Sequence, residues 1–385
     1  MSTAKQGQPL IIIGSGMAGY QLAIEVRRTQ PQLPILMITG DSGHFYSKPL
    51  LSTALAKRQE PEQLIIANPE EQAAKLGIRL MTWSQVTRID PQARQVQVEG
   101  KDLTYSNLVL ALGAQPIEVP APPGALHSVN DLDAYFNLRQ ELAGKKKLVV
   151  LGGGLVGVEM AQDLLTAGFD VSLVTRSRHL LPSLLPPPVA QLLEQALVAK
   201  GLKHYPEESF KLIDGQPGDW YLEMESGRLL TAEVALSALG LQPRIELARQ
   251  AGLQVNRGIQ VNRQLQTSDP HIYALGDCAE IEGLNLMYVQ PLMASAKLLA
   301  RQLLGEAVAL QLPALPVLVK TPSCPVVAAP PPAGALGEWH CDLEPTGAEG
   351  RFLSPEGELL GFALAGTAVK RKVQLAKAMP PLLAP

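Results

Sequence analysis

Two stretches of the chain share one pattern, in which an aliphatic run ends on glycine and continues into apolar residues at helical spacing. They are residues 10–26, LIIIGSGMAGYQLAIEV, and residues 148–164, LVVLGGGLVGVEMAQDL. A short unbroken aliphatic run is typical of a parallel strand that is covered on both faces. The apolar positions that follow recur every four residues, as on one face of a helix. The repeat predicts two strand–turn–helix units in two nucleotide-binding domains.

Shorter apolar runs supply further strands for these two units. They lie at 35–38, 107–114, 171–174, 234–243 and 272–275. Proline-rich stretches at 116–123 and 182–188 interrupt the pattern and are predicted to be connections. From about residue 312 proline becomes frequent, and strand-like pieces occur at 317–320, 326–329 and 359–364. The fold class predicted is α/β, with two Rossmann-like domains and a small separate C-terminal α+β domain.

Composition and charge exclude several classes of function. The chain has 385 residues, of which 46% are hydrophobic and 18% charged, and its net charge is −3. These values indicate no general attraction to nucleic acid or to anionic membranes. No apolar run approaches the roughly 18 residues that a spanning helix needs, and the first residues do not resemble an export signal. We therefore expect a cytoplasmic protein.

The three cysteines Cys278, Cys324 and Cys341 are widely spaced. None lies in C-x-x-C spacing with another, so neither a zinc site nor a vicinal dithiol is predicted. An odd number of widely spaced cysteines fits a reducing compartment.

The first glycine-rich turn is Gly14-x-Gly16-x-x-Gly19. Gly14 permits a tight turn, Gly16 lets the backbone approach a pyrophosphate, and Gly19 lets the helix pack closely on the sheet. An acidic residue about 20 positions further on normally binds the ribose. The second strand instead ends at Thr39, and Asp41 follows it, so Thr39 is the candidate ribose contact.

The second turn is Gly152-x-Gly154-x-x-Gly157, with the same mechanics. Its second strand ends at Thr175-Arg176-Ser177-Arg178, where a carboxylate would favour NAD and arginine can accommodate the 2′-phosphate of NADP. The segment favours NADP or tolerance of both coenzymes. Alternatively, the two arginines are ordinary solvated surface charges.

A third signal is the run that ends at Leu275-Gly276-Asp277 and precedes a helical pattern. It places a carboxylate at the carboxyl end of a strand, where ligands bind in open α/β sheets. Alternatively, Asp277 caps the next helix.

Together these motifs resemble the FAD-dependent pyridine-nucleotide reductases of glutathione-reductase-like fold, over nearly the whole chain. The matching positions are the two glycine turns and the segments 108–113, 238–240 and 272–277. The resemblance implies an FAD-binding domain at 1–115 and 246–312, an NAD-binding domain at 116–245 and a C-terminal domain at 313–385. The segments 46–52, 276–280 and 319–322 further resemble bacterial rubredoxin reductases, to which the flavorubredoxin reductases of nitric-oxide detoxification are related.

The resemblance also implies site residues. The expected FAD contacts are Gly14, Ser15, Gly16, Met17, Ala18, Gly19, Thr39, Lys48, Val86, Gly113, Glu159, Asp277, Val289 and Lys320. The expected NAD contacts are Gly152, Gly154, Leu155, Val156, Gly157, Thr175, Arg176 and Gly240. Lys48 and Glu159 are the expected catalytic residues: Lys48 would lie near the flavin N5 edge, and Glu159 would pair with it. A lysine there stabilises negative charge on reduced flavin.

The implied reaction is hydride transfer from NADH, with NADPH as the alternative, to FAD, followed by single-electron transfer to rubredoxin, which would supply an alkane hydroxylase. Flavorubredoxin or the ferredoxin of an oxygenase system are alternative acceptors, and a non-catalytic FAD/NAD-binding sensor is a third class. Disulfide reductases and NADH oxidases of this fold carry cysteine near the segment 43–53, which here reads GHFYSKPLLST. We therefore expect electrons to leave directly from the flavin. Lys370, Arg371, Lys372 and Lys377 are candidates for docking an acidic partner, or form a solvated helix face.

Overall fold

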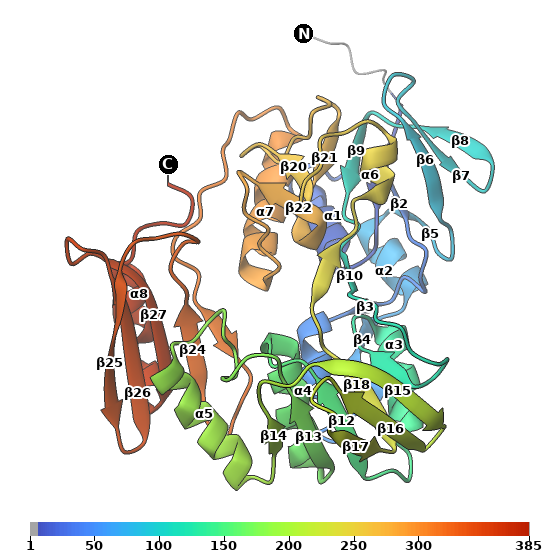
Figure 1. Ribbon diagram of the computed structural model, residues 1–385. Helices are drawn as coiled ribbons and strands as arrows, with labels where there is room; N and C mark the ends of the chain where they lie inside the picture. The colour runs from blue at the N-terminus through green and yellow to red at the C-terminus, as the bar shows by residue number, and fades with distance from the viewer. Residues whose placement is uncertain (1–6, 385) are drawn as a thin grey trace.

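The computed structural model describes residues 7–384 and contains two parallel five-stranded sheets with a third, antiparallel sheet beside them (Figure 1). The first sheet has the order β21-β9-β1-β2-β5. Its strands are β21 (Ile272–Ala274), β9 (Asn107–Leu110), β1 (Leu10–Ile13), β2 (Ile35–Ile38) and β5 (Arg79–Met81). Helix α1 (Met17–Thr29) follows β1 and packs against α7 (Val289–Gln302). The predicted first strand–turn–helix unit is confirmed.

The second parallel sheet has the order β11-β18-β12-β13-β14. Its strands are β11 (Leu126–Ser128), β18 (Val234–Ser237), β12 (Lys147–Leu151), β13 (Asp170–Val174) and β14 (Lys203–Tyr205). Helix α4 (Leu155–Ala167) follows β12, and α3 (Leu132–Glu141) and α5 (Pro187–Ala199) belong to the same half. The chain passes between the two halves through an antiparallel pair, β10 (Ala114–Pro116) with β19 (Leu241–Pro243).

Smaller elements surround the two sheets. Each half carries a three-stranded antiparallel meander: β6 (Val86–Asp90), β7 (Gln95–Val98) and β8 (Lys101–Thr104) in one, and β15 (Phe210–Gln216), β16 (Asp219–Met224) and β17 (Leu229–Ala232) in the other. The remaining short elements are β3 (Phe45–Tyr46), η1 (Lys48–Ser52), η2 (Pro61–Leu64), β4 (Ile65–Ala67), α2 (Pro69–Leu76), α6 (Glu246–Gln250), β20 (Ile259–Val261), η3 (Gly276–Cys278) and β22 (Ala279–Ile281). The prediction of a helix directly after Gly276-Asp277 is therefore wrong, because η3 and then β22 come before α7.

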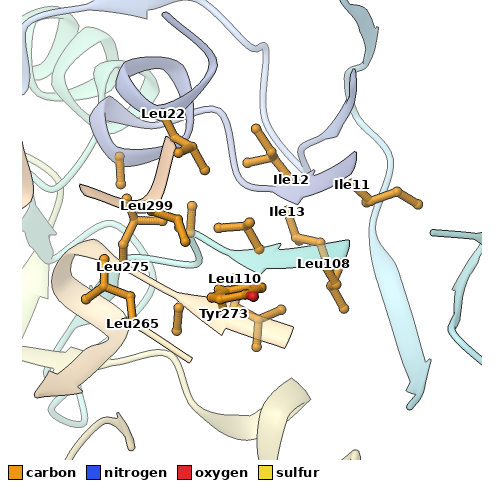
Figure 2. Packing of buried hydrophobic residues seen from close by; sticks show 14 of the residues in the cluster. Ile11, Ile12, Ile13, Leu22, Leu108, Leu110, Leu265, Tyr273, Leu275 and Leu299 are labelled. Atoms are coloured by element: carbon orange, nitrogen blue, oxygen red, sulfur yellow. The ribbon is translucent and has the colours of Figure 1, made fainter. Parts of the chain in front are cut away.

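The core of the first half joins two distant parts of the chain. Residues such as Ile12 and Leu110 pack with Leu265, Tyr273 and Leu299 in one buried cluster (Figure 2). The sides of this core come from before residue 112 and from after residue 245, which supports the proposed discontinuous FAD-binding domain.

The C-terminal sheet has the order β23-β24-β27-β26-β25. Its strands are β23 (Val317–Val319), β24 (Val326–Ala329), β27 (Leu359–Gly366), β26 (Gly347–Leu353) and β25 (Glu338–Glu344), followed by η4 (Thr367–Arg371) and α8 (Lys372–Ala378). Alternate residues of β24 and β27 bury opposite faces, as the two-residue repeat of a strand requires. Val326 and Ala363 pack with α5 residues, whereas Val327 and Phe362 pack beneath η4 and α8.

The C-terminal sheet therefore shares its core with the half that contains the second parallel sheet, and α5 lies against the C-terminal sheet in Figure 1. The chain end also returns to the first half, because Leu383 pairs with Leu312 and joins its core. Within residues 7–384, no helix is both long and apolar enough to cross a membrane.

Candidate functional site

The first glycine turn leaves an open space where a ligand can approach. Gly14 has a φ of +108°, and a Cβ on Gly19 would overlap the carbonyl oxygen of Gly14. A Cβ on Gly16, in contrast, would meet no protein atom within 4 Å. Helix α1 begins at Met17 without a side-chain cap, so the amides of its first turn, including that of Ala18, are available to an anion. This cradle fits a pyrophosphate.

A carboxylate does lie near the tip of β2, although the residue directly after the strand is Thr39. The hydroxyls of Ser15 and Thr39 donate to Asp41 Oδ1 over 3.0 and 2.7 Å, and the Gly43 amide donates to the same oxygen over 2.9 Å. Sequence spacing assigned the ribose contact to Thr39 and left Asp41 in doubt. The hydrogen bonds bring both side chains to one place beside the glycine turn, which fits ribose recognition by the pair.

Asp277 is held beside the start of α1. It follows Gly276, whose φ is +77° and whose Cβ, if present, would lie 2.9 Å from Ala18 Cβ. Burial raises the pKa of Asp277, and the nearby charge of Lys48 opposes that rise. This position, between the glycine turn and Lys48, is compatible with the predicted contact to FAD.

Lys48 begins the short helix η1 and has partners that the sequence did not predict. Its Nζ donates to Asn130 Oδ1 over 2.8 Å and lies 4.0 Å from Asp277 Oδ2. Asn130 is buried and is itself fixed by donating to the Ala114 carbonyl. Burial lowers the pKa of Lys48, while the charge of Asp277 acts in the opposite direction.

Glu159 does not pair with Lys48, so the predicted ion pair is wrong. The carboxylate accepts from Ser52 Oγ over 2.7 Å and pairs with Lys320 Nζ over 2.8 Å. The reason lies in the turn between them: Lys48 begins η1 and faces Asp277, whereas Ser52 ends η1 and faces α4. Asp163, four residues after Glu159 and thus on the same helix face, accepts from the amides of residues 55 and 56.

The second glycine turn repeats the geometry of the first. Gly152 has a φ of +112°, a Cβ on Gly157 would overlap the Gly152 carbonyl, and a Cβ on Gly154 would meet nothing within 4 Å. Helix α4 begins at Leu155 without a side-chain cap, and Val156 on its first turn is 41% exposed. The turn fits a second pyrophosphate.

The side chains after β13 divide into inward and outward groups. Thr175 is buried, and its hydroxyl lies 2.8 Å from the Ser177 carbonyl oxygen and 2.9 Å from His204 Nε2. Arg176 and Arg178 are exposed. The hydroxyl of Thr175 thus has partners within the protein, whereas the side chains of both arginines are exposed.

The remaining predicted contacts lie around this framework. Gly113 and Gly240 have φ values of +68° and +117° in the loops that follow β9 and β18. Val86 begins β6 and is buried in the first core, while Val289 begins α7 and is 41% exposed. Their contacts to cofactor remain predictions.

The cysteines are not placed for thiol chemistry. Cys278 directly follows Asp277, but it is fully buried, and burial raises its pKa to about 11. Burial also raises the pKa of Cys324 and Cys341, and all three thiols are free. A reactive thiol needs a lowered pKa and some exposure, so none of the three resembles a redox-active nucleophile.

Sequence reasoning missed Ser52, Asn130 and Asp163. Asn130 precedes Asp131, which caps α3 by accepting from the Ala134 amide. Asn and Asp are both common at helix starts, so nothing in the sequence singles out Asn130. Asp163 had one available signal, its spacing of four residues from Glu159. Ser52 had none, because its partners come from residues 159 and 320.

The sequence is similar to two protein-family models and to known reductases. Residues 8–297 match the model of the pyridine nucleotide-disulphide oxidoreductase family, and residues 309–379 match a rubredoxin binding C-terminal domain. The rubredoxin-NAD(+) reductase of Alcanivorax borkumensis is 42% identical over 97% of this chain and 99% of its own. The nitric oxide reductase FlRd-NAD(+) reductase of Vibrio vulnificus is 40% identical over 95% of this chain and 97% of its own.

Solved structures are similar over the same length. Putidaredoxin reductase in its covalent complex with putidaredoxin has a TM-score of 0.86 and 26% identity, covering 97% of this chain and 94% of that one. The NADH:rubredoxin oxidoreductase of Clostridium acetobutylicum, at 23% identity and a TM-score of 0.82, covers 97% of this chain and 94% of that one and shares the fold. With two cradles that fit FAD and a nicotinamide dinucleotide, the chain belongs to the pyridine nucleotide-disulphide oxidoreductase family, as an FAD-dependent NAD(P)H oxidoreductase.

Proposed function

We propose that the protein is a rubredoxin reductase, which takes electrons from NADH through FAD to rubredoxin. The observation that carries the proposal is the match of residues 309–379 to a rubredoxin binding domain, attached to a chain with two dinucleotide cradles. The relative from Alcanivorax borkumensis, which is 42% identical over 99% of its own length, bears the corresponding name.

The residues of the site have separable tasks in this proposal. The turn at Gly154 and the first amides of α4 bind the pyrophosphate of NADH, and Gly16 with α1 does the same for FAD. Asp41 and Thr39 orient the ribose of FAD, and Asp277 lies beside the start of α1. When bound, FAD would supply the capacity to take up two electrons from NADH and to release them one at a time. The ammonium of Lys48, partly desolvated, stabilises negative charge at the flavin.

Electrons are proposed to pass from the flavin to the partner without a protein thiol. The segment 43–53 has no cysteine, and the thiol of Cys278 is buried with a raised pKa. A protein thiolate held against the flavin would give a long-wavelength charge-transfer band on reduction. We expect no such band, and its appearance would contradict this route.

A second candidate acceptor is flavorubredoxin, because relatives named for that partner are up to 40% identical to this chain. The proposal of a rubredoxin that feeds an alkane hydroxylase, and the alternative of nitric-oxide metabolism, differ in the acceptor and not in the flavin site. A ferredoxin of an oxygenase system is a third possibility of the same kind. Since NADH is regenerated inside cells, we also propose a cytoplasmic location.

The proposal is tested by mixing oxidised holoenzyme anaerobically with NADH in a stopped-flow instrument and then adding rubredoxin. We expect rapid bleaching of the flavin followed by prompt reoxidation. Bleaching without turnover of rubredoxin, but with turnover of flavorubredoxin or a ferredoxin, would transfer the function to that acceptor. Negligible bleaching by either NADH or NADPH would instead indicate a nucleotide-binding sensor.

A further inference from the structure

Lys320 reaches from the C-terminal sheet to the turn that carries Lys48. It follows β23, within the residues that match the rubredoxin binding domain. Its ammonium donates to the Pro49 carbonyl over 2.6 Å and to Ser52 Oγ over 2.8 Å, and it pairs with Glu159 Oε2 over 2.8 Å. A lysine ammonium has three N–H donors, so these three acceptors satisfy it fully.

The carboxylate of Glu159 is equally committed. One oxygen accepts from the Lys320 ammonium and from Ser52 Oγ, and the other accepts from the Lys320 backbone amide over 3.0 Å. Glu159 is only 3% exposed, so these partners, and not water, form the hydrogen bonds of its carboxylate oxygens. The contact therefore joins three parts of the chain: η1, α4 and the residue that directly follows β23.

The turn η1 is thereby held at both ends. At its start, the ammonium of Lys48 donates a hydrogen bond to Asn130, and Nζ lies 4.0 Å from Asp277 Oδ2. At its end, the hydroxyl of Ser52 accepts a hydrogen bond from Lys320 and donates one to Glu159. Pro49, whose carbonyl accepts from Lys320, is the immediate neighbour of Lys48. A displacement of Lys320 would thus be transmitted to the position of Lys48 through one peptide unit.

We propose that Lys320 is a positioning residue of the flavin site, which fixes Lys48 and neutralises Glu159 from within the partner-binding part of the chain. The inference rests on the proposed function only for the identity of the partner, because the contacts themselves involve no acceptor protein. Two consequences follow. FAD binding depends on Lys320, and so does the reduction potential of the bound flavin, since loss of the ammonium leaves a buried carboxylate uncompensated and the Lys48 turn unsupported.

The test is a double-mutant cycle with Lys320→Gln, Glu159→Gln and the combined variant, and Lys101→Gln on exposed β8 serves as the control. FAD affinity is measured by titrating apoprotein, and the flavin midpoint potential is measured at saturating FAD. We expect K320Q to weaken FAD binding roughly 10- to 100-fold, as loss of charged hydrogen bonds does, and to shift the potential to a more negative value. The combined variant should recover part of both losses, and Lys320→Arg should retain most of the wild-type potential.

Ser52→Ala provides a second variant if K320Q folds poorly, because it removes the bridging hydroxyl and leaves both charges. It should shift the potential in the same direction by a smaller amount. A wild-type potential in K320Q, even with a lowered melting temperature, would overturn the proposal, as would additive effects of K320Q and E159Q. These readouts use no rubredoxin, so failure of the proposed acceptor would leave them unchanged.

Discussion

At the scale of single residues, two glycines three positions apart have different physical reasons to be glycine. Gly19 faces the protein, because a side chain there would overlap the Gly14 carbonyl. Gly16 faces open space, and its lack of a side chain matters only when a ligand approaches. The same contrast holds for Gly157 and Gly154 in the second turn. The structure agrees with the separate roles that the motif predicts for these positions, one in folding and one in binding.

Alanine substitutions should separate these two roles. We expect Gly19→Ala to lower the free energy of unfolding by about 1–3 kcal/mol, as overpacking does, whereas Gly16→Ala should leave apoprotein stability nearly unchanged and weaken FAD binding at least tenfold. Urea unfolding of the apoprotein and titration with FAD measure the two effects. Gly154→Ala is the matched control, since it should spare FAD and weaken NADH. Equal loss of stability in G16A and G19A would contradict the distinction.

The partners of site residues were the least predictable feature at this scale. Lys48 and Glu159 were both expected near the flavin, but their predicted pairing with each other is wrong. Which charge faces which depends on how η1 is oriented between α4 and Asp277, and a five-residue 3-10 turn has no periodicity from which to read that orientation. The true partner, Lys320, comes from a different sheet.

At the scale of elements, buried parallel strands were predicted well because their aliphatic runs are unbroken. The range predicted for β2, 35–38, is the one observed, and the run at 171–174 differs from β13 by one residue. The strands β25 and β26 were missed. β25 is mostly exposed and polar, and β26 contains two glycines and a buried Glu349, so neither shows an apolar pattern.

The segment after β13 has a predictable consequence for coenzyme choice. Arg176 and Arg178 are exposed just after β13, the part of a dinucleotide-binding domain that usually recognises the ribose, and Thr175 is turned inward. We expect the enzyme to accept NADPH as well as NADH. Replacing both arginines with alanine should raise the KM for NADPH about tenfold or more, consistent with loss of charged hydrogen bonds, and change the KM for NADH less than twofold.

Steady-state kinetics with an artificial dye as acceptor measures both constants without involving rubredoxin. Arg257→Ala, an exposed arginine in the other half, is the control and should change neither KM. If the KM values for NADH and NADPH rise equally in the double variant, the arginines bind a part that the two coenzymes share and do not discriminate between them.

At the scale of the whole molecule, the net charge is −3, so attraction of an acidic partner requires a local concentration of positive charge. The predicted patch of Lys370, Arg371, Lys372 and Lys377 is not uniform. Arg371 is paired with Glu344 over 2.8 Å and with Glu349 over 2.8 Å, so it serves the C-terminal sheet. The three lysines are exposed, and Val373, which follows Lys372 and lies four residues before Lys377, is 57% exposed. An exposed apolar residue among exposed basic residues is a composition that suits docking of an acidic protein.

Charge reversal of Lys372 and Lys377 should therefore raise the KM for rubredoxin without changing the rate of dye reduction by NADH, because electrostatic steering acts on the encounter and not on the flavin. The effect should shrink as salt is added, since screening weakens interactions between exposed charges. Lys101→Glu makes the same charge reversal at one distant, exposed lysine and should have little effect. Arg371→Glu should behave differently and lower the melting temperature, because it leaves the buried Glu349 without this partner. If dye reduction falls together with rubredoxin reduction in the Lys372/Lys377 variant, the patch belongs to the stability of the sheet and the docking surface lies elsewhere on the C-terminal domain.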